Sequence, residues 1–170
     1  MYCMADSYSL ATFEYQAITK LVIAMALGWL IGWERKHWKK PAGGRTFMLI
    51  SLGSCLFTLV SIEAALIFAS QTPADPTRIA SNILTGMGFI GGGIILHRQD
   101  HVEGVTSAAA IWVAAAVGMA VALEMYLVAG LTSVFTVIGL NLKYVTRKMM
   151  ASVANNHSEE DSDAAHDIQG

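Results

Sequence analysis

The 170-residue chain is poor in charged residues, which make up 14% of it, against about 25% in an ordinary soluble domain. Apolar residues make up 54%. The 13 acidic and 11 basic residues nearly cancel, and a net charge of -2 gives no reason to expect nucleic-acid binding. A disulfide between the two cysteines, Cys3 and Cys55, is not expected, and the pair does not define a redox compartment. This composition argues against a soluble domain and favours a small polytopic membrane protein.

The sequence also lacks the arrangements that catalysis and cofactor binding need. It contains no nucleophile–base constellation and no cofactor motif, so we expect a protein that is not an enzyme and has no cofactor. His97 and His101 stand four residues apart near Asp100 and Glu103, a spacing that suits zinc on a helix. Asp100 and Gly104 favour a turn here, so we expect a solvated loop without a metal.

Five stretches are apolar enough to form membrane-spanning helices, which need about 20 such residues. They cover 15–33, 46–69, 79–96, 105–123 and 125–142. Only Glu124 separates the last two, which predicts a tight helical hairpin. The predicted fold is all-α, with a short N-terminal segment (1–14), a transmembrane domain of five helices (15–143), and a basic juxtamembrane segment with an acidic tail (144–170). The tail is too polar to offset its chain entropy, so we expect disorder there rather than a soluble domain.

The basic residues are distributed unequally between the two predicted sides of the membrane. Nine of the 11 lie in 35–45, at Arg98 and in 143–148, which the five spans place on one side. The other two are Arg78 and Lys20, and Lys20 lies within the start of the first span. Because basic loops stay in the cytoplasm, we expect the N-terminus outside and the C-terminus in the cytoplasm.

Several polar residues lie where the second and third spans approach the outer side. Arg78 is a base on the side that the positive-inside rule avoids, so we expect it to pair with Asp75 or Glu63. Asp75 also suits the N-cap of the third helix, with Pro76 at its first position. Glu63 lies inside the second span, where an ionisable residue is a functional candidate by default. Asn82 makes the beginning of the third span more polar.

The loop after the first span is strongly basic. It contains Arg35, Lys36, Lys39, Lys40 and Arg45. Anionic lipid headgroups are the expected partners of its lysines. Glu34 and Arg45 bracket the loop and are candidates for an ion pair.

Glycines are concentrated in the first and third spans. They are Gly28 and Gly32 in a GxxxG pair, and Gly86, Gly88, Gly91, Gly92 and Gly93 in the third span. Small residues permit close helix packing, within the chain or across a dimer, and the alternative is a flexible break that lines a polar cavity. Because Gly88 and Gly92 share a helix face and Gly91 points elsewhere, packing is expected to use Gly88 and Gly92.

Four blocks, in this order, resemble the membrane domain of the MgtC/SapB family: GWLIGWER (28–35), AGGRTFMLISLGSCLFTLVS (42–61), DPTRIASNILTGMGFIGGGIIL (75–96) and GVTSAAAIWVAAAVGMA (104–120). The resemblance covers about Leu21 to Lys143. It places the family's motif on Glu34, Arg35, Gly43, Arg45, Thr46, Asp75, Arg78, Gly86, Gly88, Gly91, Gly93, Gly104 and Thr106. Where the family usually has a base before the glycine that opens the fourth span, this chain has Glu103. Longer members carry a cytoplasmic C-terminal domain, so short, SapB-like members are the closer match.

The resemblance implies a multi-pass protein of the bacterial inner membrane, linked to magnesium limitation and virulence. It offers the F-type ATP synthase as a partner, because MgtC-type members restrain that enzyme, and a homo-oligomer is the other assembly considered. Two functions stay open. One is a regulator that binds another membrane protein through small-residue helix faces. The other is a small transporter or channel, with Asp75, Arg78, Glu63 and the third-span glycines around a polar path.

Overall fold

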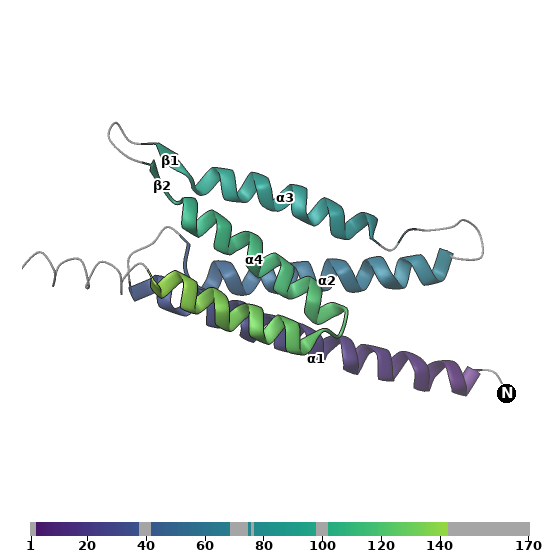
Figure 1. Cartoon of the computed structure of the whole chain (residues 1–170). Coiled ribbons are helices and arrows are strands. Elements are labelled where there is room, and N and C mark those ends of the chain that lie inside the picture. Colours follow the sequence, from purple (N-terminus) through teal and green to yellow (C-terminus); the bar gives the residue numbers. More distant parts are fainter. Residues whose placement is uncertain (1–2, 38–41, 69–74, 76, 98–101, 143–170) are drawn as a thin grey trace, which may run out of the picture. The chain divides into compact units, whose positions relative to one another are not determined.

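The computed structural model describes residues 3–37, 42–68, 75, 77–97 and 102–142, with the backbone alone described at 3–12, 34, 36–37 and 79. Its elements are α1 (Cys3–His37), α2 (Gly44–Phe68), α3 (Arg78–Ile94), β1 (Leu96–His97), β2 (Val102–Glu103) and α4 (Val105–Ala122), followed by a fifth helix, Tyr126–Leu142 (Figure 1). The predicted helical fold is therefore confirmed.

Three of these helices are long and apolar enough to cross a membrane. They are the Phe13–Trp33 part of α1, all of α2 and all of α4. Helix α3 has 17 residues and ends at Ile94, two residues before the predicted end, since three consecutive glycines disfavour further helix. The fifth helix is also shorter than the three. Length and composition thus identify three spanning helices, against the five predicted.

Helix α1 also begins earlier than predicted. It starts at Cys3 and continues without a break through the first span, so the described part of the predicted N-terminal segment (1–14) is helical, while the apolar part of the helix begins at Phe13. Its C-terminal boundary at His37 lies four residues beyond the predicted one at Trp33.

Helices α2 and α4 are central to the packing, because each contacts all three of the other labelled helices. At Ser51 of α2, the helices on both sides present a glycine. A Cβ on Gly28 of α1 would lie 2.6 Å from the Phe47 carbonyl oxygen and 2.7 Å from the Ser51 Cβ, and one on Gly118 of α4 would overlap the Ser51 carbonyl oxygen. Close approach at Ser51 therefore requires glycine on both neighbours.

A two-stranded hairpin joins α3 to α4. Strand β1 pairs antiparallel with β2, with Leu96 opposite Glu103. His97 and Glu103 therefore lie in strands and not in a helix, while the residues between the strands, 98–101, lie outside the described residues. Gly104 follows β2 with φ 94°, and a Cβ there would overlap the Ile94 carbonyl oxygen. Only glycine suits this left-handed, crowded position, and the reversal sets α3 beside α4 (Figure 1).

The third-span glycines do not pack as expected. A Cβ on Gly91 would lie 3.5 Å from the Ala108 Cβ of α4, which is ordinary contact. Cβ atoms on Gly86, Gly88, Gly92 and Gly93 would meet no atom within 4 Å. Within the described chain, Gly91 thus faces a neighbouring helix, whereas Gly88 and Gly92 face open space, the reverse of the prediction for packing inside the chain.

Large apolar side chains lie on the outside of the helices. Phe89 is 88% exposed and Leu66 67% exposed. Exposed apolar surface of this extent is found where a protein meets lipid or another protein, which agrees with a membrane location.

We predict that Gly28→Ala and Gly118→Ala each destabilise the protein by about 1–3 kcal/mol, the usual cost of overpacking. The reason is that each new methyl group would meet backbone or Cβ atoms of α2 that cannot move away. Gly92→Ala is the matched control, because its methyl group meets open space. Thermal unfolding in detergent measures the three, and equal melting temperatures would contradict the packing at Ser51.

Candidate functional site

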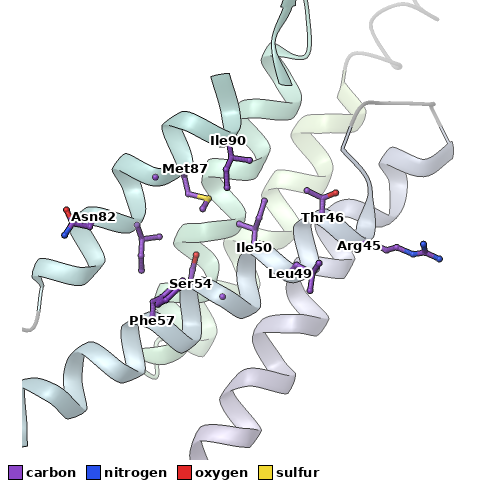
Figure 2. Close-up of a pocket in the computed structure, with 12 residues that line it drawn as sticks. Arg45, Thr46, Leu49, Ile50, Ser54, Phe57, Asn82, Met87 and Ile90 are labelled. Atoms are coloured by element: carbon purple, nitrogen blue, oxygen red, sulfur yellow. The ribbon is translucent and has the colours of Figure 1, made fainter. Parts of the chain in front are cut away.

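A cavity of about 630 Å³ lies between α2 and α3. Its lining comes from Arg45, Thr46, Leu49, Ile50, Gly53, Ser54 and Phe57 of α2 and from Asn82, Ile83, Gly86, Met87 and Ile90 of α3 (Figure 2). Eight of these twelve residues are apolar or glycine. We refer to this cavity as the α2–α3 groove.

The few polar residues of the groove are spread along its length. Arg45 and Thr46 lie at the beginning of α2 and Asn82 near the beginning of α3, at the opposite end (Figure 2). The exposed Arg45 side chain extends away from the groove (Figure 2). Ser54 lies between them, 2% exposed, and its hydroxyl has no hydrogen-bond partner among the described residues. The groove thus has an apolar body and one charged end.

Other hydroxyls in the helices are satisfied locally. Thr58 donates to the Ser54 carbonyl at 2.7 Å and Ser133 to the Ala129 carbonyl at 2.8 Å. This back-bonding within one helix lets a polar side chain lie in an apolar environment. These hydroxyls therefore do not indicate a polar path.

Arg35, which the resemblance marks as a motif residue, lies in the interior. It is 4% exposed, and its guanidinium donates to the Ser107 hydroxyl at 2.5 Å. The contact connects the end of α1 to the beginning of α4. Sequence reasoning did not identify Ser107, which has no distinguishing spacing within the small-residue run of α4.

Asp75 organises the turn before α3 from outside the helix. The helix begins at Arg78 with Thr77 at the N-cap, so the prediction of Asp75 as N-cap is wrong; Pro76 lies outside the described residues. The Thr77 N–H and hydroxyl both donate to the Asp75 carboxylate, at 2.8 and 2.7 Å. The side-chain bond from Thr77, then its backbone bond and the nearby charge of Arg78, lower the pKa of Asp75.

Arg78 does not form the predicted ion pair. Among the described residues it has no salt bridge with Asp75 or Glu63, although its charge acts on Asp75. Arg78 is exposed, and the Asp75 carboxylate is already held by Thr77. Glu63 is half-buried on α2. Because Arg78 is solvated, it can do without an ion pair among the described residues.

An ion pair that sequence reasoning missed connects α1 to the turn after α4. The Lys20 ammonium lies 2.9 Å from the Glu124 carboxylate and donates to the Ala122 carbonyl at 3.3 Å. Lys20 is thereby a cap for the C-terminal end of α4, where a cation is stabilised. A lysine inside an apolar span needs a carboxylate, and Glu124 is the acid between the last two predicted spans, so the signal was present.

The predicted candidates do not converge on one centre. Arg45, Thr46 and Asn82 line the α2–α3 groove, Arg35 is in the interior, and Asp75 and Arg78 belong to the turn before α3. Thr106 is exposed at the beginning of α4. The Glu34 side chain, Lys36, Lys39, Lys40, Asp100 and His101 lie outside what is described. Within the described side chains, no group of three or more His, Cys, Asp or Glu could hold a metal ion.

Comparison with known proteins gives a family match over most of the chain. The MgtC family matches residues 21–149. The chain is 39% identical to SapB of Bacillus subtilis over 136 residues, which are 78% of this chain and 59% of SapB. It is 42% identical to YhiD of Escherichia coli K12, described as a proposed magnesium transporter, over 127 residues, 74% of this chain and 59% of YhiD.

A third relative is MgtC of Salmonella typhimurium, which is 38% identical over 102 residues, 60% of this chain and 41% of MgtC. The chain thus spans less than two-thirds of the length of each of these three relatives. No solved structure matches it.

We predict that Glu124→Gln destabilises the protein more than Lys20→Met. The first change leaves an ammonium in a side chain that is 12% exposed, whereas the second leaves a carboxylate in one that is 63% exposed. Glu124→Gln should lower the free energy of unfolding by about 1–2 kcal/mol, because the exposed carboxylate is partly solvated in the native protein. This is less than the about 3–5 kcal/mol that is lost when one partner of a fully buried ion pair is removed. Unfolding of the single and double variants measures this, and a double variant less stable than Glu124→Gln would contradict the pairing.

We predict that the Thr77 amide resonance titrates with a midpoint below about 3.9, the ordinary pKa of Asp. The pKa of Asp75 is lowered in the folded chain, so its stabilisation of the turn is complete above the unfolded pKa. It is lost as the pH falls through the lower, folded pKa. Asp75→Asn should remove the titration. An NMR titration with a midpoint at or above 3.9 would contradict the two Thr77 bonds.

Proposed function

Because the chain belongs to the MgtC family, we propose that it is a magnesium-linked protein of the bacterial inner membrane that regulates another membrane protein. We further propose that it is not an enzyme. The names of its relatives, MgtC and the proposed magnesium transporter YhiD, support the link to magnesium. Regulation by contact is supported by a helix face of α3 that nothing in the described chain covers.

All five helices cross the membrane in this proposal, with the N-terminus outside. Helix α3 has 17 residues, which rise about 26 Å at 1.5 Å each, near the about 30 Å of the hydrocarbon core. The β1–β2 hairpin and the turn at Glu124 reverse the chain. The nine-to-two distribution of basic residues supports this orientation.

The uncovered face consists of Ser81, Thr85, Gly88 and Gly92, which we call the α3 stripe. These residues recur at spacings of four, three and four and are all exposed. The Ser81 hydroxyl donates to the Arg78 carbonyl and the Thr85 hydroxyl to the Ser81 carbonyl. Small residues whose hydroxyls are satisfied within the helix suit close packing of a second transmembrane helix. The stripe is therefore the contact surface of the proposed regulator.

The partner is then a membrane protein that presents a helix to the α3 stripe. The F-type ATP synthase is the partner that the family resemblance offers, and a second copy of this chain is the other. A transporter is the alternative function, supported by the description of YhiD. Magnesium prefers oxygen ligands, carboxylates above all, and no Asp or Glu is among the residues that line the α2–α3 groove. This favours the regulator.

We predict that the full chain lowers ATP-driven proton pumping by the ATP synthase in inverted membrane vesicles, and that Gly88→Leu and Gly92→Leu abolish the effect. Both leucines enter open space in the chain, so folding should persist while helix docking is blocked. Gly130→Leu, on the fifth helix and also facing open space, is the matched control and should act as the native chain does.

A parallel assay separates the two functions. Purified chain in liposomes that contain a magnesium indicator should give no more magnesium entry than empty liposomes. Entry that depends on the protein would favour the transporter. Unchanged proton pumping in all the vesicles would reject the ATP synthase as the partner.

A further inference from the structure

We propose that the α2–α3 groove binds one acyl chain of an anionic phospholipid, whose headgroup lies at Arg45. The groove lies on a different side of α3 from the α3 stripe. Its α3 wall is formed by Ile83, Met87 and Ile90, whereas the stripe follows 81, 85, 88 and 92, on the opposite side of a helix with 3.6 residues per turn. Lipid binding is therefore independent of the regulation proposed above.

The dimensions of the groove suit an acyl chain. From Arg45 to Phe57 the α2 wall rises about 18 Å at 1.5 Å per residue, so a volume of about 630 Å³ gives a mean cross-section of at least about 35 Å². Extended alkyl chains packed at about 4 Å between carbons need roughly 15–20 Å² each. The groove is therefore wide enough for an acyl chain along its length.

The depth and lining of the groove agree with this occupant. Its length of about 18 Å slightly exceeds half of the about 30 Å hydrocarbon core, the depth that one leaflet's chains reach. Leu49, Ile50 and Phe57 on one side face Ile83 and Ile90 on the other, an apolar surface along most of the length. An alkyl chain buries this surface without needing polar contacts.

The charge at one end orients the lipid. Arg45 is exposed where the groove ends, and its side chain extends outward (Figure 2), so the headgroup that it meets lies outside the groove; no described residue forms a salt bridge with it. It is the second residue of α2, so the positive end of the helix dipole lies beside it. The segment 35–45 carries five of the 11 bases and is on the predicted cytoplasmic side. A headgroup phosphate at this position gains from both positive features.

The test uses the full chain extracted from vesicles that contain equal parts of palmitoyl-oleoyl phosphatidylglycerol and palmitoyl-oleoyl phosphatidylcholine, with retained lipids counted by native mass spectrometry. The native chain should retain phosphatidylglycerol in preference to phosphatidylcholine. Gly53→Leu and Gly86→Leu should lose it, because each side chain would fill the groove from one wall, where a Cβ meets no atom within 4 Å. Gly130→Leu, outside the groove, should retain it.

Arg45→Gln tests the headgroup without relying on the glycine variants. It should lower the retention of phosphatidylglycerol relative to phosphatidylcholine about fivefold, the share of one basic residue near an anionic headgroup. The proposal is overturned if folded Gly53→Leu and Gly86→Leu retain as much phosphatidylglycerol as the native chain does. The proposal is also overturned if the native chain binds the two lipids equally and Arg45→Gln does not change this. It is overturned as well if the native chain has the mass of a dimer and Gly53→Leu and Gly86→Leu are monomers, since a second copy would then occupy the groove.

Discussion

The close approach of three helices at Ser51 is the constraint on which the rest of the structure depends. Helices α1 and α4 reach α2 there because Gly28 and Gly118 have no side chains. In lipid, the hydrophobic effect does not drive helices together, so contact between backbones has to supply the attraction. The three helices that meet at Ser51 are also the three that length and composition identify as candidate membrane spans. Their association fixes the frame against which α3 lies.

Helix α3 packs against this group of helices more through α4 than through α2. It contacts α4 near Gly91 and Ala108, and the α2–α3 groove separates much of it from α2. Since Gly118 brings α4 close to α2, and the short β1–β2 hairpin joins the end of α3 to the beginning of α4, α3 does not approach α2 closely along its whole length. The groove and the α3 stripe, which no described residue covers, both follow from this arrangement.

The sequence predicted the helices well, because apolar runs bounded by Asp, Gly and charged residues are local signals. The limits found for α2, α4 and the fifth helix lie within about two residues of those predicted. The packing role of Gly28 was accessible through the GxxxG spacing, and so was that of Gly32, where a Cβ would lie 2.5 Å from the Gly44 Cα of α2. That of Gly118 was not, since it lies in a run of alanines and valines with no spacing that sets it apart.

The polar residues were predicted less well, for a physical reason. Spacing shows which residues share a helix, but pairing between helices depends on their rotation and depth. Arg78 was expected to find a carboxylate and is instead exposed, while Lys20 and Glu124, 104 positions apart, form the ion pair. Glu124 has φ 64°, an unusual conformation for a residue other than glycine. That turn directs its carboxylate toward α1, and no pattern of residue types reveals such a direction. The charge inside the first span alone showed that a partner was needed, and the fold determined which one.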